Sequence, residues 1–305
     1  MIYTVTLNPS LDYTVFTDRL NPGVTNRSQR ELIFAGGKGI NVSSYLCSAG
    51  IPNLALGFLA GFTGAEIRRM LSERGIREEM IMLPEGMSRI NVKIKADIET
   101  EINGSGPLVT NEALEELLSR IDRIGSGDHL VLSGSVPPSV PRDIYLRIAQ
   151  RIEGSGVLLS VDSEGDLLRT VLPLRPFIVK PNQSELSSVL GTDIGTFEEA
   201  LQGADRLQRS GAQNVIVSLG ELGAVLKTGG NECFICRSAE GRAVNSVGAG
   251  DCLLASFLSG YVSGKSMEEC LRLGVAAGCA CAFGEGLSDP DKASKIISEV
   301  NVLRV

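Results

Sequence analysis

Short strand-like segments alternate with helix-like segments along most of this chain, and no other feature of the sequence limits its fold as strongly. The strand-like segments are short and mainly apolar, and the segments between them carry apolar residues at helical spacing. Such alternation is typical of βαβ units, whose strands form a mainly parallel sheet with helices on both faces. The expected strands are residues 2–7, 54–59, 129–132, 157–161, 177–179 and 214–218, and the expected helices are residues 38–49, 64–74, 111–124, 142–152, 184–190, 196–210, 249–263 and 266–283.

Residues 13–34 and 89–102 depart from this alternation. Both alternate polar and apolar residues like strands, but neither is followed by a helix that would place it in the parallel sheet. We expect them to form a small separate β-layer that acts as a lid over the open edge of an α/β site. The alternative is that both are edge strands of the main sheet. An exposed strand face on such a lid also predicts a homodimer.

The composition is that of an ordinary globular protein, with 43% hydrophobic and 21% charged residues in 305. No linker divides the chain, so residues 1–305 are expected to form one α/β domain that carries the lid. The formal net charge of −7 argues against a nucleic-acid partner, because such proteins need basic patches. No apolar run approaches the ~20 residues that span a bilayer, no secretory signal is visible, and the seven cysteines fit reduced thiols. We therefore expect a cytoplasmic protein that binds neither membranes nor nucleic acids.

The segment NSVGAGD, residues 245–251, places three small residues before an apolar helical run. Gly248, Ala249 and Gly250 let the backbone approach a ligand closely, and a helix N-terminus offers free N–H groups and a partial positive charge to an anion. Asp251 lies in the first turn of that helix. The segment predicts an anion site; the alternative is a turn in which Asp251 merely favours the helix N-terminus.

A second glycine-rich loop, AGGKGIN at residues 35–41, also opens a helix. It places Lys38 among glycines, where the lysine charge and exposed backbone amides suit a phosphate. The alternative is an ordinary strand-to-helix turn with a solvent-exposed lysine.

Polar residues also follow two of the expected strands. Asp12 follows the first strand, and KPNQSE at residues 180–185 follows the strand at residues 177–179. Parallel α/β sheets bind ligands at the carboxyl ends of their strands, so Asp12 is placed to accept hydrogen bonds from sugar hydroxyls. Asn182 and Glu185 are three residues apart at a helix start, and oxygen ligands at that spacing suit Mg²⁺.

These motifs together resemble the PfkB carbohydrate kinase family, part of the ribokinase superfamily. The resemblance covers essentially the whole chain and rests on AGGKGINVS at residues 35–43, VGAGDCLLASFLSG at residues 247–260, and Lys180-Pro181-Asn182 with Glu185. It implies a doubly wound α/β fold with a mainly parallel sheet and a small β-sheet lid, in agreement with the two excursions. It also implies an enzyme that uses ATP and Mg²⁺.

The resemblance implies a role for each matching residue. Asp251 would be the catalytic base, and the amides of Gly248, Ala249 and Gly250 would form the anion hole for the transferring phosphoryl group. The residues implied to bind the sugar or its phosphate are Asp12, Gly36, Gly37, Lys38, Asn41, Arg89 and Ser135. Those implied to face ATP are Lys180, Asn182, Ser218, Gly220, Gly223 and Ser246, and Asn182 with Glu185 would organise Mg²⁺.

Further segments resemble kinases of ketohexose phosphates, among them TLNPSLD at residues 6–12, SRINVKI at residues 88–94 and LSGSVPP at residues 132–138. The implied reaction is ATP-dependent phosphorylation of fructose 1-phosphate to fructose 1,6-bisphosphate. The alternatives are tagatose 6-phosphate, an unphosphorylated sugar or nucleoside, and a sugar-phosphate sensor without activity, against which intact Asp251 and Glu185 argue. Lys38 and Arg89 favour a substrate that already bears a phosphate, because cations buried without an anion are costly.

Overall fold

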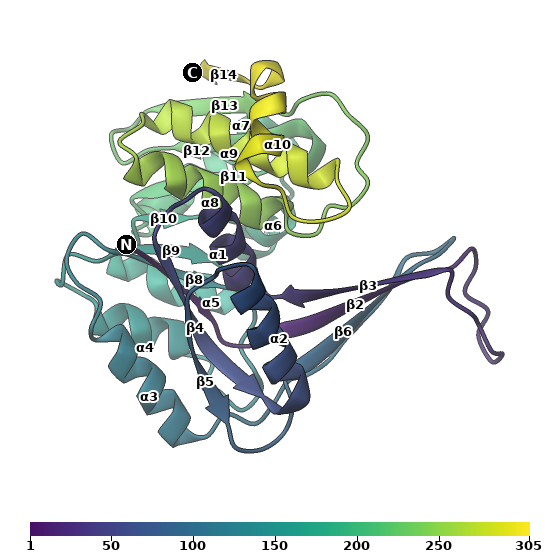
Figure 1. Cartoon of the computed structure of the whole chain (residues 1–305). Coiled ribbons are helices and arrows are strands. Elements are labelled where there is room, and N and C mark those ends of the chain that lie inside the picture. The colour runs from purple at the N-terminus through teal and green to yellow at the C-terminus, as the bar shows by residue number, and fades with distance from the viewer.

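A computed structural model describes residues 1–305 of the protein (Figure 1). Its main sheet has ten strands. Seven neighbouring strands are parallel, and three strands at one edge continue the sheet in antiparallel order. The expected mainly parallel α/β sheet is therefore confirmed. In sheet order the strands are β14 (Asn301–Arg304), β13 (Cys233–Arg237), β12 (Gly223–Lys227), β11 (Asn214–Ser218), β10 (Ile178–Val179), β9 (Leu158–Asp162), β8 (His129–Ser133), β1 (Ile2–Thr6), β4 (Asn53–Ala60) and β5 (Glu78–Leu83).

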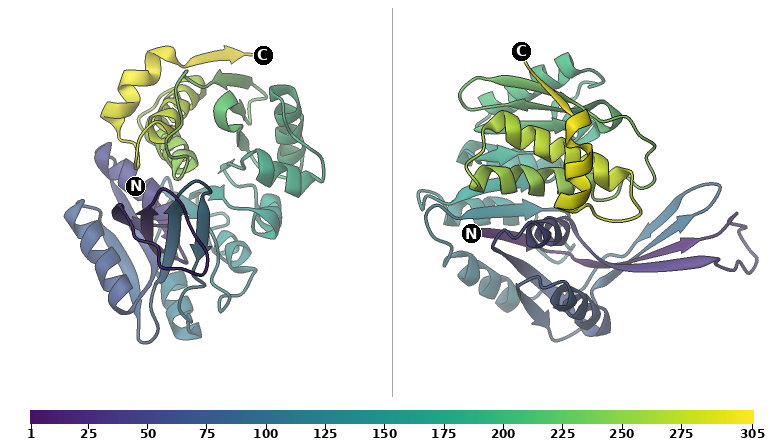
Figure 2. Two further views of the ribbon diagram at one scale, coloured as in Figure 1. Left: turned by 90° about the vertical axis from the view of Figure 1, so that its right-hand side faces the viewer. Right: turned by 45° about the horizontal axis from the view of Figure 1, so that its top comes forward.

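Helices cover both faces of this sheet (Figure 2). Each face carries its own apolar core. Leu132 and Val217 pack into the first core, and their neighbours Val131 and Ile216 pack into the second, because successive strand residues point to opposite faces. The helices of the first face are α3 (Asn111–Ile121), α4 (Ile144–Arg151), α5 (Gly165–Val171), α6 (Gln183–Leu190) and α7 (Phe197–Arg209), and those of the second are α1 (Lys38–Ser48), α2 (Gly61–Glu73), α8 (Ala249–Val262) and α9 (Met267–Ala282), with α10 (Pro290–Ile296) packed on α9.

A separate sheet of four strands forms the second layer, which we call the lid sheet. Figures 1 and 2 show it projecting from the body, with residues 17–29 as a loop at its tip. The expected separate β-layer is confirmed, and the alternative of edge strands in the main sheet is wrong. The layer begins at Ser10 rather than at residue 13, because Ser10 already pairs with Gly36 and Arg89. In sheet order its strands are β3 (Arg30–Gly36), β2 (Ser10–Phe16), β6 (Arg89–Lys95) and β7 (Thr100–Asn103), of which β2 and β6 are parallel to each other.

The lid sheet is fixed to the body at its root and touches it again further out. At the root, Leu11 and Ala35 pack with Ile40 and Ile67 in a small buried cluster. Further out, Arg30 of β3 forms a two-point ion pair with Glu285, with nitrogen–oxygen distances of 3.0 and 2.7 Å. Both side chains of this ion pair are exposed.

Several elements differ from the sequence expectations. Helix α2 begins at Gly61 rather than at residue 64; Gly61 has a φ of 59°, which glycine adopts readily, so the helix starts directly after β4. The segment EEMIML forms strand β5 at the sheet edge, although its two glutamates obscure the apolar pattern. No helix combines the length and the apolar character that crossing a membrane requires.

Candidate functional site

Several of the predicted site residues lie where the carboxyl ends of the parallel strands face the start of α8. Asp162 ends β9, Lys180 follows β10, and Ser135 follows β8. The loop before α8 approaches this edge so closely that a Cβ on Gly250 would lie 3.1 Å from the Lys180 ammonium nitrogen. The sheet and the helix start therefore bring together segments that are far apart in the sequence, as parallel α/β folds do at ligand sites.

The loop before α8 depends on its small residues. Gly248 has a φ of 85°, and a Cβ on it would lie 2.5 Å from Leu287 Cδ2. The N–H groups of Gly248 and Gly250 donate to no backbone carbonyl, so they are free for an anion. The N–H group of Ala249, in contrast, donates to the Ser246 carbonyl at 3.2 Å. Of the three predicted anion-hole amides, two are therefore available and one is already used in this loop.

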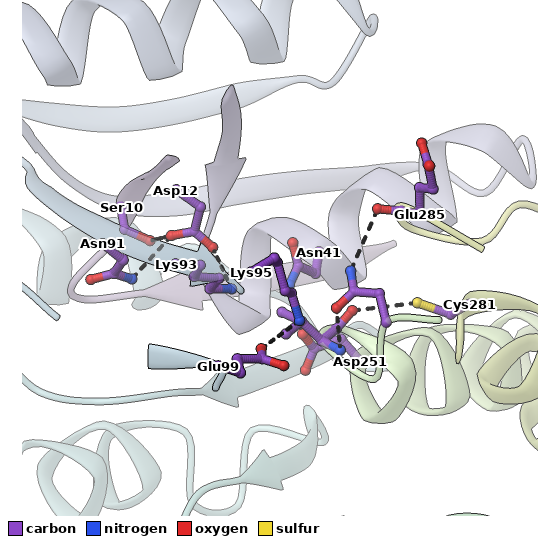
Figure 3. A network of polar contacts seen from close by, with 12 residues as sticks. Ser10, Asp12, Asn41, Asn91, Lys93, Lys95, Glu99, Asp251, Cys281 and Glu285 are labelled. Atoms are coloured by element: carbon purple, nitrogen blue, oxygen red, sulfur yellow. Dashed lines mark hydrogen bonds and ion pairs between the residues drawn. The ribbon is translucent and has the colours of Figure 1, made fainter. Parts of the chain in front are cut away.

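Asp251 is buried in the first turn of α8 and accepts a hydrogen bond from Asn41 Nδ2 at 2.7 Å (Figure 3). Burial and the nearby carboxylate of Asp162 raise the pKa of Asp251 to about 6, against the opposing effects of Asn41, Lys38 and Lys180. A carboxyl group with a pKa near neutrality can take a proton from a hydroxyl and return it at modest cost. The geometry suits a general base.

A charged cluster surrounds Asp162, a residue that the sequence analysis did not identify. Its fully buried carboxylate lies 2.9 Å from Lys38 Nζ and 3.0 Å from Lys180 Nζ, and Lys38 also lies 3.4 Å from Glu185. Burial alone would raise the pKa of Asp162, but the two lysines lower it. The available signal was its position directly after the expected strand of residues 157–161. The same reasoning pointed to Asp12, which lies instead within β2 of the lid sheet.

The ion pairs of this cluster also show that Lys38 is not an unpaired cation. Burial alone would lower the pKa of Lys38, but the carboxylates of Asp162, Glu185 and Asp251 raise it above its ordinary value. Lys38 is therefore a cation with counter-ions rather than the unpaired cation that the sequence argument assumed. Arg89 fits that argument better: it forms no ion pair, donates from Nε to the Asn8 carbonyl at 3.0 Å, and has a pKa lowered by burial.

A first cavity of about 520 Å³ lies between the lid sheet and the body. Asp12, Gly36 and Asn41 line it, together with Lys93 and Lys95 of β6. A Cβ on Gly36 would lie 2.6 Å from Asp12 Cγ, so only glycine leaves room for the Asp12 carboxylate. Lys93 was not identified from the sequence, although the alternation of SRINVKI places it on the same strand face as Arg89.

A second cavity, of about 870 Å³, contains Gly37, Lys38, Arg89 and Ser135. Gly37 and Lys38 lie where the glycine-rich loop joins α1, Arg89 lies on β6, and Ser135 lies in the segment after β8. The two cations and the hydroxyl are thus brought to one space, as a phosphate-binding site requires.

A third cavity, of about 910 Å³, contains Asn182, Ser218 and Gly220. Ser218 pairs with Asn182 in an isolated bridge, which joins the end of β11 to the start of α6. Gly223 and Ser246 line none of the three cavities. A Cβ on Gly223 would lie 2.1 Å from the Cys236 carbonyl oxygen, so that glycine is required by the close approach of β13.

Asn182 and Glu185 form the capping box of α6. Asn182 Oδ1 accepts the Glu185 N–H at 2.8 Å, and Glu185 Oε2 accepts the Asn182 N–H at 2.8 Å. No group of three or more His, Cys, Asp or Glu residues is arranged to chelate a metal. The pair fits Mg²⁺ in another way, because this ion keeps several water ligands and is held by one or two carboxylates together with substrate phosphates.

The chain is similar to sugar kinases over nearly its whole length. The family model described as pfkB family carbohydrate kinase matches residues 6–293. The 1-phosphofructokinase of Bacillus subtilis (strain 168) is 41% identical over 306 residues, which cover 100% of both proteins. The D-tagatose-1-phosphate kinase of Bacillus licheniformis is 36% identical over 304 residues, which cover 99% of both proteins. The solved structure of phosphofructokinase-2 from Escherichia coli in complex with fructose-6-phosphate aligns with a TM-score of 0.90 at 28% identity and covers 97% of this chain and 98% of that chain.

Proposed function

Because the chain belongs to the pfkB family of carbohydrate kinases, we propose that it transfers the terminal phosphoryl group of ATP to the C6 hydroxyl of fructose 1-phosphate and forms fructose 1,6-bisphosphate. The 41% identity with a 1-phosphofructokinase supports this substrate. The 36% identity with a D-tagatose-1-phosphate kinase supports the same class, because tagatose differs from fructose only in its configuration at C4. The substrate class is thus a ketohexose 1-phosphate.

The observation that carries the proposal is the placement of Asp251. Its carboxyl group is buried beside the free amides of Gly248 and Gly250, and its pKa is raised to about 6. The carboxylate takes the proton of the sugar C6 hydroxyl as the hydroxyl oxygen bonds to the terminal phosphorus of ATP, and the bond from that phosphorus to the bridging oxygen breaks and releases ADP. The free amides bind oxygens of the transferring group. In phosphoryl transfer the protein forms no covalent bond to the substrate, so positioning and charge stabilisation supply most of the rate enhancement.

The sugar occupies the space between the lid sheet and the glycine-rich loop before α1. Asp12 and Asn41 bind its hydroxyls, and Gly36 and Gly37 let the backbone approach the ring. Arg89, Lys38 and Ser135 hold the phosphate at C1, which leaves C6 toward Asp251. Arg89 supports this arrangement most directly, because it lines the second cavity without a carboxylate partner.

ATP lies on the other side of Asp251, along the third cavity. Lys180, Asn182, Ser218, Gly220, Gly223 and Ser246 are the residues proposed to face it. Asn182 and Glu185 would hold Mg²⁺ through its water ligands, and the ion would neutralise charge on the ATP phosphates. Lys180, held by Asp162 beside Gly250, adds a positive charge next to the transferring group.

We also propose a homodimer through the outer face of the lid sheet. Ile33, Tyr13, Val92 and Ile102 are paired in register and form one row across all four strands. Ile33 and Ile102 are 47% and 61% exposed. A contiguous apolar row on a projecting sheet is typical of a surface that a second chain covers.

A turnover assay tests the function. Purified protein with ATP and Mg²⁺ is offered fructose 1-phosphate, tagatose 1-phosphate, tagatose 6-phosphate and free fructose, and ADP release is measured. We expect the highest kcat/KM with fructose 1-phosphate and a value at least ~100-fold lower with fructose, which lacks the charged contacts. A preference for tagatose 6-phosphate or for a free sugar would reject the proposed substrate. Binding of sugar phosphates without ADP release would indicate a sensor.

A further inference from the structure

The carboxylate of Asp12 is held on both oxygens by neighbours within the lid sheet (Figure 3). Oδ1 accepts hydrogen bonds from Ser10 Oγ at 2.6 Å and from Asn91 Nδ2 at 3.0 Å. Oδ2 lies 3.2 Å from Lys93 Nζ. Asp12 and Asn91 are directly paired in the register of β2 and β6, and Lys93 is the next residue on the same strand face. The network is therefore built into the strand pairing.

Lys93 is unusual because its side chain is only 11% exposed. Lysine is almost never buried without a partner, because removal of its charge from water is costly. Its one ion-pair partner is Asp12, and it lines the first cavity together with Asp12 and Asn41. The pairing compensates the burial of both charges and fixes where the Asp12 carboxylate points.

Lys95 provides a contrast on the same strand. It lies two residues further along, on the same face, and lines the same cavity. Its ion pair, however, is with Glu99 within the turn between β6 and β7, and it does not touch Asp12 (Figure 3). The two lysines lie on the same face of the same strand and carry the same charge, but they form ion pairs with different carboxylates.

We propose that Lys93 is a positioning residue for sugar recognition, which holds Asp12 Oδ2 so that the carboxylate accepts hydrogen bonds from the sugar hydroxyls. This inference rests on the proposed function, in which Asp12 binds the sugar. Lys93 lies on the lid sheet, lines the first cavity and acts through Asp12. It thus belongs to the substrate-binding machinery although it was not apparent from the sequence motifs.

The test compares Lys93→Met with Lys95→Met in steady-state kinetics. Loss of a charge-assisted contact is expected to raise the KM for fructose 1-phosphate ~10- to 100-fold in Lys93→Met, with the KM for ATP and kcat changed less than about threefold. Lys93→Arg should recover most of the affinity, because it keeps the charge. Lys95→Met should raise the KM clearly less than Lys93→Met does, because Lys95 lines the same cavity but pairs with Glu99 and does not hold Asp12. Equal effects of the two methionine variants would overturn the proposal.

A double-mutant cycle with Asp12→Asn separates action through Asp12 from a direct contact with the sugar. If Lys93 acts through Asp12, Lys93→Met adds little to the KM once Asp12→Asn is present. Additive effects would overturn the proposal. The same cycle can be measured as the free energy of unfolding in urea, which needs no substrate. The effects of the two substitutions on that free energy are expected to be coupled as well. Absence of this coupling contradicts the inference even if wild type proves inactive. Inactive wild type with intact coupling would instead reject the proposed function alone.

Discussion

At the scale of single residues, the proposed chemistry depends most on Asp251. In Asp251→Asn the amide can still accept the hydrogen bond from Asn41, but it cannot take a proton from the sugar. We expect kcat to fall by at least ~10²–10⁴-fold with little change in either KM. The unfolding midpoint should stay the same or rise, because the substitution removes a charge that burial and Asp162 disfavour. A kcat within about threefold of wild type would remove Asp251 from the mechanism.

The raised pKa of Asp251 also predicts how activity depends on pH. The group must be ionised to act as a base, so activity is present above its pKa of about 6 and is lost as the pH falls through that value. The pH profile of kcat/KM reports this group in the free enzyme. We expect an acid limb with a midpoint near the pKa of about 6, and its disappearance in Asp251→Asn. An unchanged limb in the variant would assign it to another group.

Arg89 and Lys38 should behave differently when they are removed. Arg89→Met leaves no carboxylate without an ion-pair partner, so we expect a ~10- to 100-fold higher KM for the sugar phosphate and an unchanged KM for ATP. Lys38→Met also raises the KM for the sugar phosphate, but it removes one of the two lysine partners of Asp162 and the only lysine partner of Glu185, so it should lower kcat and thermal stability as well. Unchanged sugar-phosphate affinity in Arg89→Met would contradict the phosphate anchor.

At the scale of elements, the start of α8 depends on one glycine conformation. Gly248→Ala puts a Cβ 2.5 Å from Leu287 Cδ2 at a φ of 85°, so the loop must shift and the free amides move with it. We expect loss of most activity and of ~1–3 kcal/mol in the free energy of unfolding. Gly264→Ala is the matched control, because Gly264 has a φ of 77° and open space around it. It should lose stability only. Equal activity losses would show that strain alone is responsible.

The way the elements are arranged explains which parts of the site could be predicted from the sequence. The glycine-rich loops and the pair of Asn182 and Glu185 at a helix start were recognisable, because each is a local pattern within a few residues. That the pair forms a capping box came only from the structure. Asp162 and Lys93 have their ion-pair partners in distant segments, and those pairings follow from sheet order and strand register. The pairing of β2 with β6 aligns Asp12 with Asn91 across an interval of 79 residues. No local pattern contains that information.

At the scale of the whole molecule, the outer face of the lid sheet should join two chains. Replacing Ile33 by Asp places a charge in the apolar row of that face, so we expect wild type to be a dimer and Ile33→Asp a monomer at micromolar concentration in light scattering. Ile98→Asp is the control, because Ile98 is 72% exposed but lies outside the strands of the lid sheet. Its dimer should persist. A monomeric wild type would contradict the proposed interface.

The ion pair between Arg30 and Glu285 has a consequence for how quickly substrate enters. It joins the outer part of the lid sheet to the body, and both partners lie in water. Dissolved ions screen such a contact, and its net strength is small even with two-point geometry. Separation of the two surfaces therefore needs no exposure of buried apolar side chains at this point. We therefore expect the separation of these two surfaces beside the proposed sugar site to become faster as ionic strength rises.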